Sequence, residues 1–584
     1  MIKHQSSVSR LSCLALAISA ALGTTPALAQ QDTVEEVVVT GSRGRPRTVI
    51  ESPVPVDVFS ESDLQAVSYT DTNNILQTLI PSYNVSRQAI SDGASFIRTP
   101  TLRDLPVDKT LVLVNSKRRH RASLVQIGGS GTQGPDVATI PSAALKNVEV
   151  LRDGAAAQYG SDAIAGVINF ILKDNRDGGS LSVDTGEFFE GDGEQLTVQG
   201  NIGLPLGDTG FLSISGEFWE SDYTSRGKQY CQGSICLNKN DPGYDPDASY
   251  NVFLDDPDFV AGTRRATIGA GGGDVVQPWG QPENEAIRVF FNSGIELGAD
   301  AELYAYGNYS DSSTNGNFFY RTPVSSQLQQ LREPDGSIYD PLLELYRGGF
   351  TPQFFGDIQD YSLAAGIRGE WNNGWTYDFS GRHGYNEIEY TLKNTMNPSI
   401  GPGTPTSFKP GDLSNAETQF QADFTKEYDM DLASPVLLAL GLSWMDEEYE
   451  VYESSDPNSY AAGPYSTSDP FGFCNDGTAT AAGLGVIANG STLNCADSDD
   501  PVFNVGPVGS NGFPGYSPLF ADVYARDSYA LYADVSADVT DQLFMQGAVR
   551  YEDYEDFGDE LVAKLAGRYA FTDTFAMRGS VGTG

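Results

Sequence analysis

The chain has 584 residues, and its 36 lysines and arginines against 78 aspartates and glutamates give a net charge of −42 at pH 7. Such an acidic chain is not suited to nucleic acid, because phosphate binding requires a basic surface. Residues 45–174 contain 13 basic and 13 acidic side chains, so the excess acid lies almost wholly beyond residue 174.

Residues 1–29 have the composition of an export signal. A basic start with Lys3, His4 and Arg10 precedes an apolar run over residues 11–22 and an Ala-Leu-Ala cleavage site at 27–29. The run is shorter than the roughly 20 residues that span a bilayer, so we favour export over a membrane anchor. No later segment is an apolar helix of membrane length, so the exported chain is expected to be soluble or to cross a membrane as strands.

The stretch VEEVVVTGSR, residues 34–43, contains an isolated run of strand-forming residues at 37–39. The Gly-Arg-Pro of residues 44–46 breaks the pattern directly after it, and no neighbouring segment offers a strand. From its residues alone, the partner of this strand is open.

Residues 45–174 are expected to form a compact mixed domain of ordinary size. The apolar patterns predict helices at residues 60–67, 71–79 and 142–146, and strands at residues 54–59, 110–114, 148–151 and 166–172.

After Lys173 the apolar pattern changes to alternation with period two, which is typical of half-buried strands. One example is the run in which residues 212, 214, 216 and 218 alternate with the more polar residues 213, 215 and 217. Short turns near residues 297–300, 539–541 and 572–574 alternate with long Gly/Pro/Asp-rich loops near residues 222–284, 312–360 and 452–524. This asymmetry favours an outer-membrane barrel over a sandwich or solenoid of a secreted enzyme.

Four cysteines lie in two local pairs, Cys231 with Cys236 and Cys474 with Cys495. Both pairs lie in loop-like stretches, so we predict two disulfides formed in an oxidising compartment. A metal site is the alternative, but no third ligand lies near the first pair in sequence. The acidic loops at 240–247 and 253–259 could hold Ca²⁺, although solvated loops are favoured because neither matches an EF-hand.

Four segments of residues 45–174 resemble the TonB-dependent outer-membrane receptors. They are SPVPVDVFSESDL (52–64), DTNNILQTLIPSYNV (71–85), KTLVLVNSKRRHR (109–121) and IPSAALKNVEVLRDGAAAQYGSDAIAGVINFILK (140–173). The resemblance implies an antiparallel transmembrane β-barrel with an N-terminal α+β plug domain in its lumen. The expected division is a signal peptide at 1–29, a TonB-box segment at 30–44, the plug at 45–174, called the plug region below, and the barrel at 175–584.

The resemblance also implies a role for the isolated strand. Its position is that of the family's TonB box, which adds as a strand to the periplasmic domain of TonB, and the box residues are then Glu35, Glu36, Val37, Val38, Val39 and Thr40. A disordered leader is the alternative.

The implied function is energy-coupled import of a ligand, a siderophore-iron complex or another large solute, across the outer membrane of a Gram-negative bacterium. The implied partners are TonB with its inner-membrane energising complex, the outer-membrane lipid and an external small molecule. The sequence contains no nucleophile elbow, metalloprotease motif or Walker loop, so we expect no catalytic residue, no cofactor and no metal site.

The densest basic cluster is Lys117, Arg118, Arg119, His120 and Arg121. In the resembling family this loop lies toward the extracellular apex, so the cluster could face an anionic ligand. The favoured alternative is that these cations pair with lumen carboxylates of the barrel wall, because 62 of the acids lie beyond the plug region. Asn115-Ser116 replaces the family's usual Asn-Gly, which places the turn geometry in question.

Glu149, Arg152 and Asp153 lie in VEVLRDG. The resemblance implies that the arginine joins an ionic lock between plug and barrel, whereas a static salt bridge is equally compatible with the sequence.

About 13 strands are expected after the plug region, whereas plugged transporters of this size class close with about 22. The ending MRGSVGTG resembles the start of a Phe-Arg-Ala-Pro motif, so we expect a truncated barrel. The alternatives to a transporter are a structural or adhesive barrel, or a non-functional receptor fragment. A surface signal transducer is disfavoured, because only residues 30–34 separate the signal from the box.

Overall fold

The computed structural model describes residues 37–38, 40, 47–85, 93–126, 129–226, 231–232, 235–265, 280–298, 300–572 and 574–584. Two compact units divide the chain, Met1–Val37 and Val38–Gly584. The expected export signal and three residues of the expected TonB box, Glu35, Glu36 and Val39, lie outside the described residues.

The plug region is built on a five-stranded mixed sheet with the order β3-β8-β9-β6-β7. Its β6 and β9 strands run parallel and the other neighbours are antiparallel. The bounds are β3 (Val56–Ser60), β6 (Thr110–Val114), β7 (Lys117–Arg118), β8 (Leu145–Leu151) and β9 (Gly166–Leu172). The smaller elements are α2 (Glu61–Gln65), α3 (Thr72–Leu79), α4 (Ala156–Tyr159), β4 (Tyr83–Asn84), β5 (Thr101–Leu102), η1 (Val107–Lys109), η2 (Val137–Thr139) and η3 (Ser142–Ala144).

The sequence explains where the plug-region elements begin. Ser60 caps α2 in a reciprocal pair with Asp63, and Asp71 caps α3 by accepting the Asn74 N–H. All five residues of β6 are buried, because its two faces contact different apolar clusters. The helix predicted at residues 142–146 is wrong: a single 3-10 turn, η3, ends at Ala144, and Leu145 already belongs to β8.

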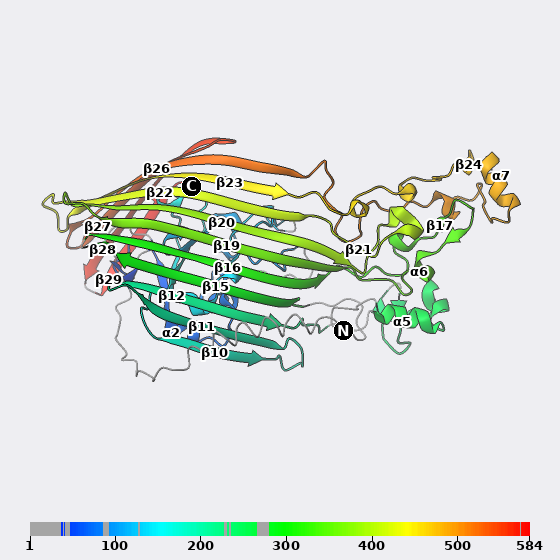
Figure 1. The fold of residues 1–584 in the computed structure, drawn as a ribbon, viewed down its shortest axis with the longest axis horizontal. Coiled ribbons are helices and arrows are strands. Elements are labelled where there is room, and N and C mark those ends of the chain that lie inside the picture. The colour runs from blue at the N-terminus through cyan, green and yellow to red at the C-terminus, as the bar shows by residue number, and fades with distance from the viewer. Residues whose placement is uncertain are drawn as a thin grey trace. The chain divides into compact units, whose positions relative to one another are not determined.

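A large antiparallel sheet follows, which we call the wall. Thirteen strands succeed one another in chain order along it, and one short strand, β21, pairs with β20 (Figure 1). The predicted count of about 13 is therefore confirmed. The bounds are β10 (Gly179–Gly186), β11 (Gln195–Leu206), β12 (Gly210–Ser221), β15 (Glu283–Glu296), β16 (Ala301–Asn317), β19 (Gln353–Glu370), β20 (Trp375–Lys393), β21 (Ser407–Phe408), β22 (Asp412–Tyr428), β23 (Val436–Val451), β26 (Asp522–Thr540), β27 (Leu543–Tyr554), β28 (Gly558–Thr572) and β29 (Phe575–Gly582).

The two faces of the wall differ in polarity. Along β19, Asp360 and Ser362 point to the plug region and hydrogen-bond to it, whereas Tyr361 and Leu363 are 37% and 53% exposed on the opposite face. Alternation with polar residues inward and apolar residues outward is the pattern of a membrane barrel and the reverse of a soluble one.

The wall strands are joined by short turns at one end and long loops at the other. Figure 1 shows α5, α6, α7, β17 and β24 gathered beyond the same end of the strands. The loop elements are β13 (Cys231–Gln232), β14 (Ile235–Cys236), η4 (Ser249–Phe253), α5 (Pro257–Arg265), η5 (Ser326–Leu328), β17 (Leu331–Arg332), β18 (Ile338–Tyr339), α6 (Pro341–Glu344), η6 (Pro398–Gly403), η7 (Pro457–Ser459), η8 (Pro464–Ser466), β24 (Cys474–Asn475), β25 (Thr478–Ala479), α7 (Ala481–Ala488) and η9 (Pro501–Phe503).

The loop predicted at 312–360 is too long at both ends, because β16 extends to Asn317 and β19 begins at Gln353. Small and polar residues dominate the end of β16, and their weak apolar signal hid the strand from the sequence pattern.

None of the helices in the described residues combines the length and the apolar character needed to cross a lipid bilayer.

Candidate functional site

The basic segment Lys117–Arg121 begins after a tight turn. Asn115 and Ser116 have φ values of +47° and +65°, so both adopt the left-handed conformation. Hydrogen bonds hold the turn: among them, the Leu172 N–H donates to Asn115 Oδ1 at 2.9 Å and the Ser116 N–H donates to Asn169 Oδ1 at 3.0 Å. Serine thus adopts a conformation that glycine would adopt more easily.

Lys117 and Arg121 each reach two carboxylates of the wall. The Lys117 Nζ lies 3.0 Å from Asp378 on β20 and 3.3 Å from Asp423 on β22. The Arg121 Nε lies 2.8 Å from Glu417 on β22, and its NH2 group pairs with Glu447 on β23. These pairs bind one turn of the plug region to three consecutive strands of the wall.

Arg119 and His120 share a single wall carboxylate, that of Asp360 on β19. The Arg119 NH2 lies 2.6 Å from Asp360 Oδ1, and His120 Nε2 lies 2.8 Å from Oδ2. All three side chains are buried, and burial lowers the pKa of His120 against the opposing effect of Asp360. Arg119 also donates to Asn308 and Ser362, so the wall satisfies much of this guanidinium.

Arg118 differs from its neighbours because its partners lie within the plug region. It pairs with Asp162 and donates to the Tyr159 carbonyl at 2.9 Å. The contacts of the other four residues correspond to the interpretation favoured from the sequence, in which the cations pair with wall carboxylates. Their role toward a ligand stays a prediction.

A cavity of about 400 Å³ adjoins the basic segment, between the plug region and the wall strands β22, β23, β26 and β27. Arg118, Arg119 and Arg121 line it together with the wall residues Glu417 and Glu447. Its lining therefore contains both signs of charge.

The three residues expected to form a plug–barrel lock have different partners. Glu149 accepts the Thr40 N–H at 2.7 Å, and Arg152 pairs with Asp57 of the plug region at 2.7 Å. Asp153 contacts the wall, because the Lys564 Nζ on β28 lies 2.9 Å from its carboxylate. The expected pairing of Arg152 with the wall is thus replaced by a pair inside the plug region, since β3 runs beside β8 and brings Asp57 close.

Further plug–wall contacts are both apolar and polar: buried apolar clusters contain side chains of both parts, and hydrogen bonds add to them. The Ser161 N–H donates to Glu552 at 3.0 Å, and the Ser123 N–H donates to Asn386 at 2.8 Å. The Tyr306 hydroxyl donates to the Val114 carbonyl at 2.9 Å. The individual wall residues could not be identified from the sequence, because strand register decides which of the many acidic positions face inward.

The plug region also contains a buried acidic residue that no sequence pattern indicated. Asp136 Oδ1 accepts the N–H groups of Arg98 and Ala138 at 3.2 and 2.9 Å, and its side chain is 5% exposed. Burial raises its pKa to about 6, with a further contribution from the charge of Asp360. The guanidinium of Arg98 pairs instead with Asp71 at 2.6 Å.

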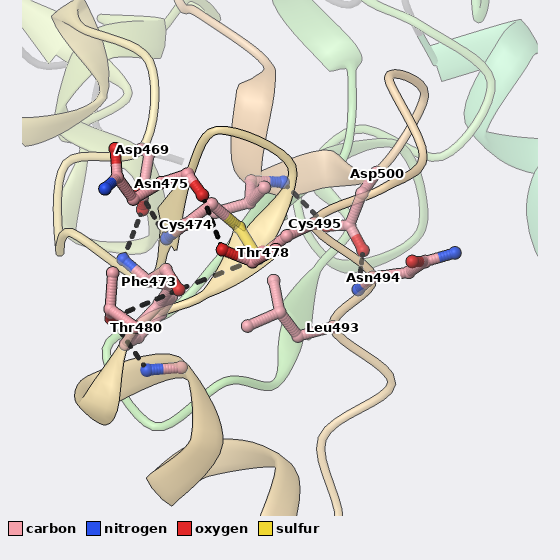
Figure 2. The surroundings of a disulfide bond; sticks show 12 residues. Asp469, Phe473, Cys474, Asn475, Thr478, Thr480, Leu493, Asn494, Cys495 and Asp500 are labelled. Atoms are coloured by element: carbon pink, nitrogen blue, oxygen red, sulfur yellow. Dashed lines mark hydrogen bonds between the residues drawn. A yellow bond between two sulfur atoms is a disulfide. The ribbon is translucent and has the colours of Figure 1, made fainter.

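Both predicted cysteine pairs form disulfides, Cys231–Cys236 and Cys474–Cys495. Figure 2 shows the second one between the β24–β25 hairpin and the segment that leads to Asp500. Asp469 accepts the N–H groups of Phe473 and Cys474, both at 2.8 Å, and so fixes the chain at the disulfide.

Two long loops are joined by a buried ion pair close to this disulfide. Arg332 of β17 donates through Nε and NH2 to the two oxygens of Asp500, each at 2.9 Å. Asp500 also accepts the N–H groups of Asn494 and Val502, and these hydrogen bonds together with Arg332 hold its pKa below the usual value despite burial. We call Arg332 and Asp500 the loop clasp.

The acidic loop at 240–247 uses carboxylates for its own turns. Asp241 accepts the Gly243 N–H and Asp245 accepts the Asp247 N–H, both at 2.9 Å. Calcium binding by this loop stays an open alternative.

Two protein-family models match the chain. Residues 48–167 match the TonB-dependent receptor plug domain, and residues 288–584 match the TonB-dependent receptor-like β-barrel. The second match covers half of the chain.

Curated relatives match shorter parts of the sequence. An iron-regulated outer membrane virulence protein of Vibrio cholerae is 26% identical over 223 residues, 37% of this chain and 33% of the relative. A probable TonB-dependent siderophore receptor of Acinetobacter baumannii is 28% identical over 163 residues, 27% of this chain and 22% of the relative. The chain thus matches a third or less of the length of these relatives.

Solved structures share the fold at low sequence identity. A ferric enterobactin receptor mutant from Pseudomonas aeruginosa in complex with enterobactin gives a TM-score of 0.52 at 15% identity, over 89% of this chain and 60% of that one. The ferric citrate transporter FecA gives 0.52 at 11% identity, over 90% and 62% of the two chains.

Proposed function

The chain belongs to the TonB-dependent receptors, a family of the Gram-negative outer membrane, and we propose that it imports a nutrient ligand with energy supplied through TonB. A siderophore-iron complex is the leading candidate ligand, because the similar proteins include a probable siderophore receptor and a ferric citrate transporter. Another large solute is the alternative.

The observation that carries this proposal is the set of ion pairs between the plug region and the wall. Lys117, Arg119 and Arg121 pair with carboxylates on β19, β20, β22 and β23, beside apolar clusters to which both parts contribute. Water can replace the ionic contacts when the plug region shifts, whereas exposing the apolar clusters costs free energy. A plug region held by both kinds of contact suits displacement that is driven by an external energy source.

The docking strand for TonB is proposed to be Glu35–Thr40. Its β-branched residues suit strand addition. Val38 belongs to β1 (Val37–Val38) and lies in the second compact unit. It pairs with β2 (Arg47–Thr48) in a ladder only two residues long. A ladder this short adds little stability, so exchange for a strand of TonB costs little. Residues 30–44 would then form the box segment, 45–174 the plug and 175–584 the β-barrel.

The basic segment Lys117–Arg121 is proposed to meet the ligand only when the plug region moves, because its cations already have carboxylate or carbonyl partners. No covalent chemistry is proposed for the protein. Its work would be binding, displacement of the plug and passage of the ligand.

The experiment uses the full-length receptor in its native outer membrane and ⁵⁵Fe supplied as ferric enterobactin or as ferric citrate. Deletion of Glu35–Thr40 should abolish uptake of the accepted chelate and leave surface binding intact. The matched control deletes no residue and replaces Glu35 and Glu36 with glutamine, which keeps the backbone for strand addition.

Unchanged uptake in the deletion variant would overturn the energy-coupling proposal. Absence of both binding and uptake for every chelate and nutrient offered would favour the alternative of a structural or adhesive barrel, or of a non-functional receptor fragment.

A further inference from the structure

A cleft of about 470 Å³ lies between residues 68–78 of the plug region and the ends of β10, β11 and β12, which are neighbours in the wall (Figure 1). β12 ends at Ser221, where a long loop begins, so the cleft lies at the end of the wall that carries the long loops. Its volume is within the range of small-molecule sites. None of its described lining residues belongs to the cavity beside the basic segment, so it is a separate site.

Three aromatic rings from different elements line the cleft. Tyr69 precedes α3, Phe188 follows β10 and Trp219 belongs to β12. Tyr69 and Phe188 are 50% and 42% exposed, whereas Trp219 is buried. A sugar ring presents C–H groups on its faces, and the electron-rich face of an aromatic ring attracts such groups while their contact removes apolar surface from water. The two exposed rings therefore offer stacking positions for sugar rings.

Four side-chain amides line the same cleft, those of Asn74, Gln77, Gln195 and Gln281. Within the part of the chain that the structure describes, the side-chain amides of Gln195 and Gln281 form no hydrogen bond. An amide both donates and accepts, as a sugar hydroxyl does, whereas an organic cation offers no acceptor to the amide NH2 group. The amides therefore favour a ligand rich in hydroxyl groups over a cation, although the aromatic rings alone would suit either.

The charges of the cleft disfavour an anionic ligand. No lysine, arginine or histidine is among its described lining residues, and its carboxylates are those of Asp71, Glu187 and Asp222. Arg226 lies 4.8 Å from the centre of the Phe188 ring, but its guanidinium pairs with Asp192 at 2.9 Å. An anionic iron chelate would meet like charge in this cleft, whereas a neutral ligand has no such cost.

Hydrogen bonds hold both sides of the cleft in place. On the wall side, the Thr224 N–H donates to the Gln281 carbonyl at 3.0 Å, and the Gln281 N–H donates to Thr224 Oγ1 at 2.8 Å. On the plug side, the hydroxyl oxygens of Thr70 and Thr197 lie 3.0 Å apart and join the residue after Tyr69 to β11. These contacts fix the backbone that carries the rings and amides before a ligand arrives, which lowers the entropic cost of binding.

A second cavity, of about 440 Å³, adjoins the cleft and shares Ser68 and Tyr69 with it. It continues along β10 and β11, and Ser142, Ser180 and Ser182 add hydroxyl groups to its lining. Tyr69 thus borders both spaces. A ligand of several linked units can therefore occupy the cleft and extend past this ring.

We propose that the cleft binds a neutral oligosaccharide, which stacks on Tyr69 and Phe188 and whose hydroxyl groups bond to Gln195 and Gln281. This inference rests on the proposed function and specifies its alternative ligand, a large solute other than a siderophore-iron complex. An organic cation is the other kind of ligand that aromatic rings and carboxylates attract, and the test separates the two.

The test measures equilibrium binding of radiolabelled hexasaccharides to the full-length receptor in outer-membrane vesicles. The neutral probes are maltohexaose, cellohexaose, xylohexaose and mannohexaose, and the cationic probe is hexa-glucosamine. We expect at least one neutral probe to bind, with an affinity that changes less than about twofold between about 20 and 300 mM NaCl, because no ionic contact is involved. Binding of none of the neutral probes, or of hexa-glucosamine alone, would overturn the proposal.

Variants of the two exposed rings locate the bound sugar. Phe188→Ala and Tyr69→Ala should each weaken binding of the accepted probe roughly tenfold, because each removes a stacking surface. Phe189→Ala is the matched control for the first, since Phe189 is the next residue, is fully exposed and is not part of the cleft lining. Tyr69→Phe keeps the ring and should weaken binding less than about threefold. Unchanged affinity in both alanine variants would place the sugar elsewhere and contradict the assignment.

Failure of the oligosaccharide site and failure of the proposed function give different results. Deletion of Glu35–Thr40 should abolish uptake of the bound hexasaccharide and leave its binding unchanged. If wild-type cells bind the hexasaccharide through Phe188 but do not accumulate it, the proposed function fails and the binding site stands. If uptake of a ferric chelate requires Glu35–Thr40 while no neutral hexasaccharide binds, only the oligosaccharide site fails.

Discussion

Arg119 of the plug region and Asp360 of the wall form a buried ion pair, with 2.6 Å between NH2 and Oδ1 and side-chain exposures of 4% and 3%. His120 occupies the second oxygen of the same carboxylate. Two adjacent residues of the plug region therefore depend on one acidic residue of β19. Among single substitutions, we expect one at Asp360 to weaken the attachment of the plug region to the wall most.

Asp360→Asn should destabilise the seating of the plug region by roughly 3–5 kcal/mol, because Arg119 would remain buried without its anion. The measurement is the urea dependence of protease access to the plug region in vesicles. Glu302→Gln is the matched control, since the pair of Glu302 with Arg368 is partly exposed and should contribute less than about 1 kcal/mol. Equal urea midpoints for the two variants would contradict this role of Asp360.

Asp153→Asn should weaken retention of the plug region, because Asp153 is the residue of the VEVLRDG motif that pairs with the wall, through Lys564. Arg152→Met is the contrast, since Arg152 pairs with Asp57 inside the plug region and is 43% exposed. Single-molecule pulling from the N-terminal side should give a lower extraction force for the first variant and a wild-type force for the second. The reverse order would assign the lock to Arg152.

Stability of the plug region should depend on pH through Asp136, whose pKa rises from 3.8 to about 6 on burial. Because the folded state holds the proton more tightly, this residue stabilises the fold at low pH, and that contribution is lost as pH rises from about 4 to above 6. The shift corresponds to about 3 kcal/mol.

Asp136→Asn keeps an oxygen for the N–H groups of Arg98 and Ala138 but cannot ionise. Relative to this variant, wild type should lose about 3 kcal/mol of unfolding free energy between pH 4 and pH 7. Urea titrations at the two pH values measure the difference, and parallel pH profiles of the two proteins would refute it.

Removal of the loop clasp by Asp500→Asn should loosen the two long loops without unseating the plug region, because Arg332 is only 1% exposed and would lose its anion. Hydrogen exchange should rise in residues 452–521 and in the β17–β18 hairpin. Asp335→Asn on the exposed turn of that hairpin is the control and should change stability by less than about 0.5 kcal/mol.

Loss of the second disulfide, by Cys474→Ser with Cys495→Ser, should have a comparable effect. It frees a loop with a sequence separation of 21, which corresponds to about 3 kcal/mol. If hydrogen exchange in these loops stays at the wild-type level in both the Asp500 and the cysteine variants, other contacts must hold the loops together.

Local chemistry made much of the fold predictable. The strand at Thr110–Val114 was predicted with its observed bounds, because a run of five apolar or β-branched residues is flanked by polar residues. The alternation along β12 and β19 identified the wall for the same reason. The helix predicted at 142–146 is wrong because Leu145 begins β8 and pairs with Leu172 of β9, and this tertiary pairing outweighs helix propensity.

The contacts within the candidate site could not be predicted from the sequence and became evident only from the folded chain. The sequence predicted that the basic segment pairs with wall acids, but the choice of Asp360 among the many acidic residues follows from register across β16, β19 and β20. Arg332 and Asp500 are 168 residues apart, and no local pattern links them. Glu149 was expected to face the wall, whereas its place on a central strand directs it to Thr40.

Residues 35–40 are proposed to add as a strand to TonB, and photo-cross-linking in living cells, with a reactive residue placed at each of these positions in turn, tests this pairing. Strand addition predicts cross-links to TonB that alternate in strength from one position to the next, since successive side chains of a strand point to opposite faces. Absence of a TonB cross-link at every position from 35 to 40, with the receptor correctly placed in the outer membrane, would rule out strand addition by this segment.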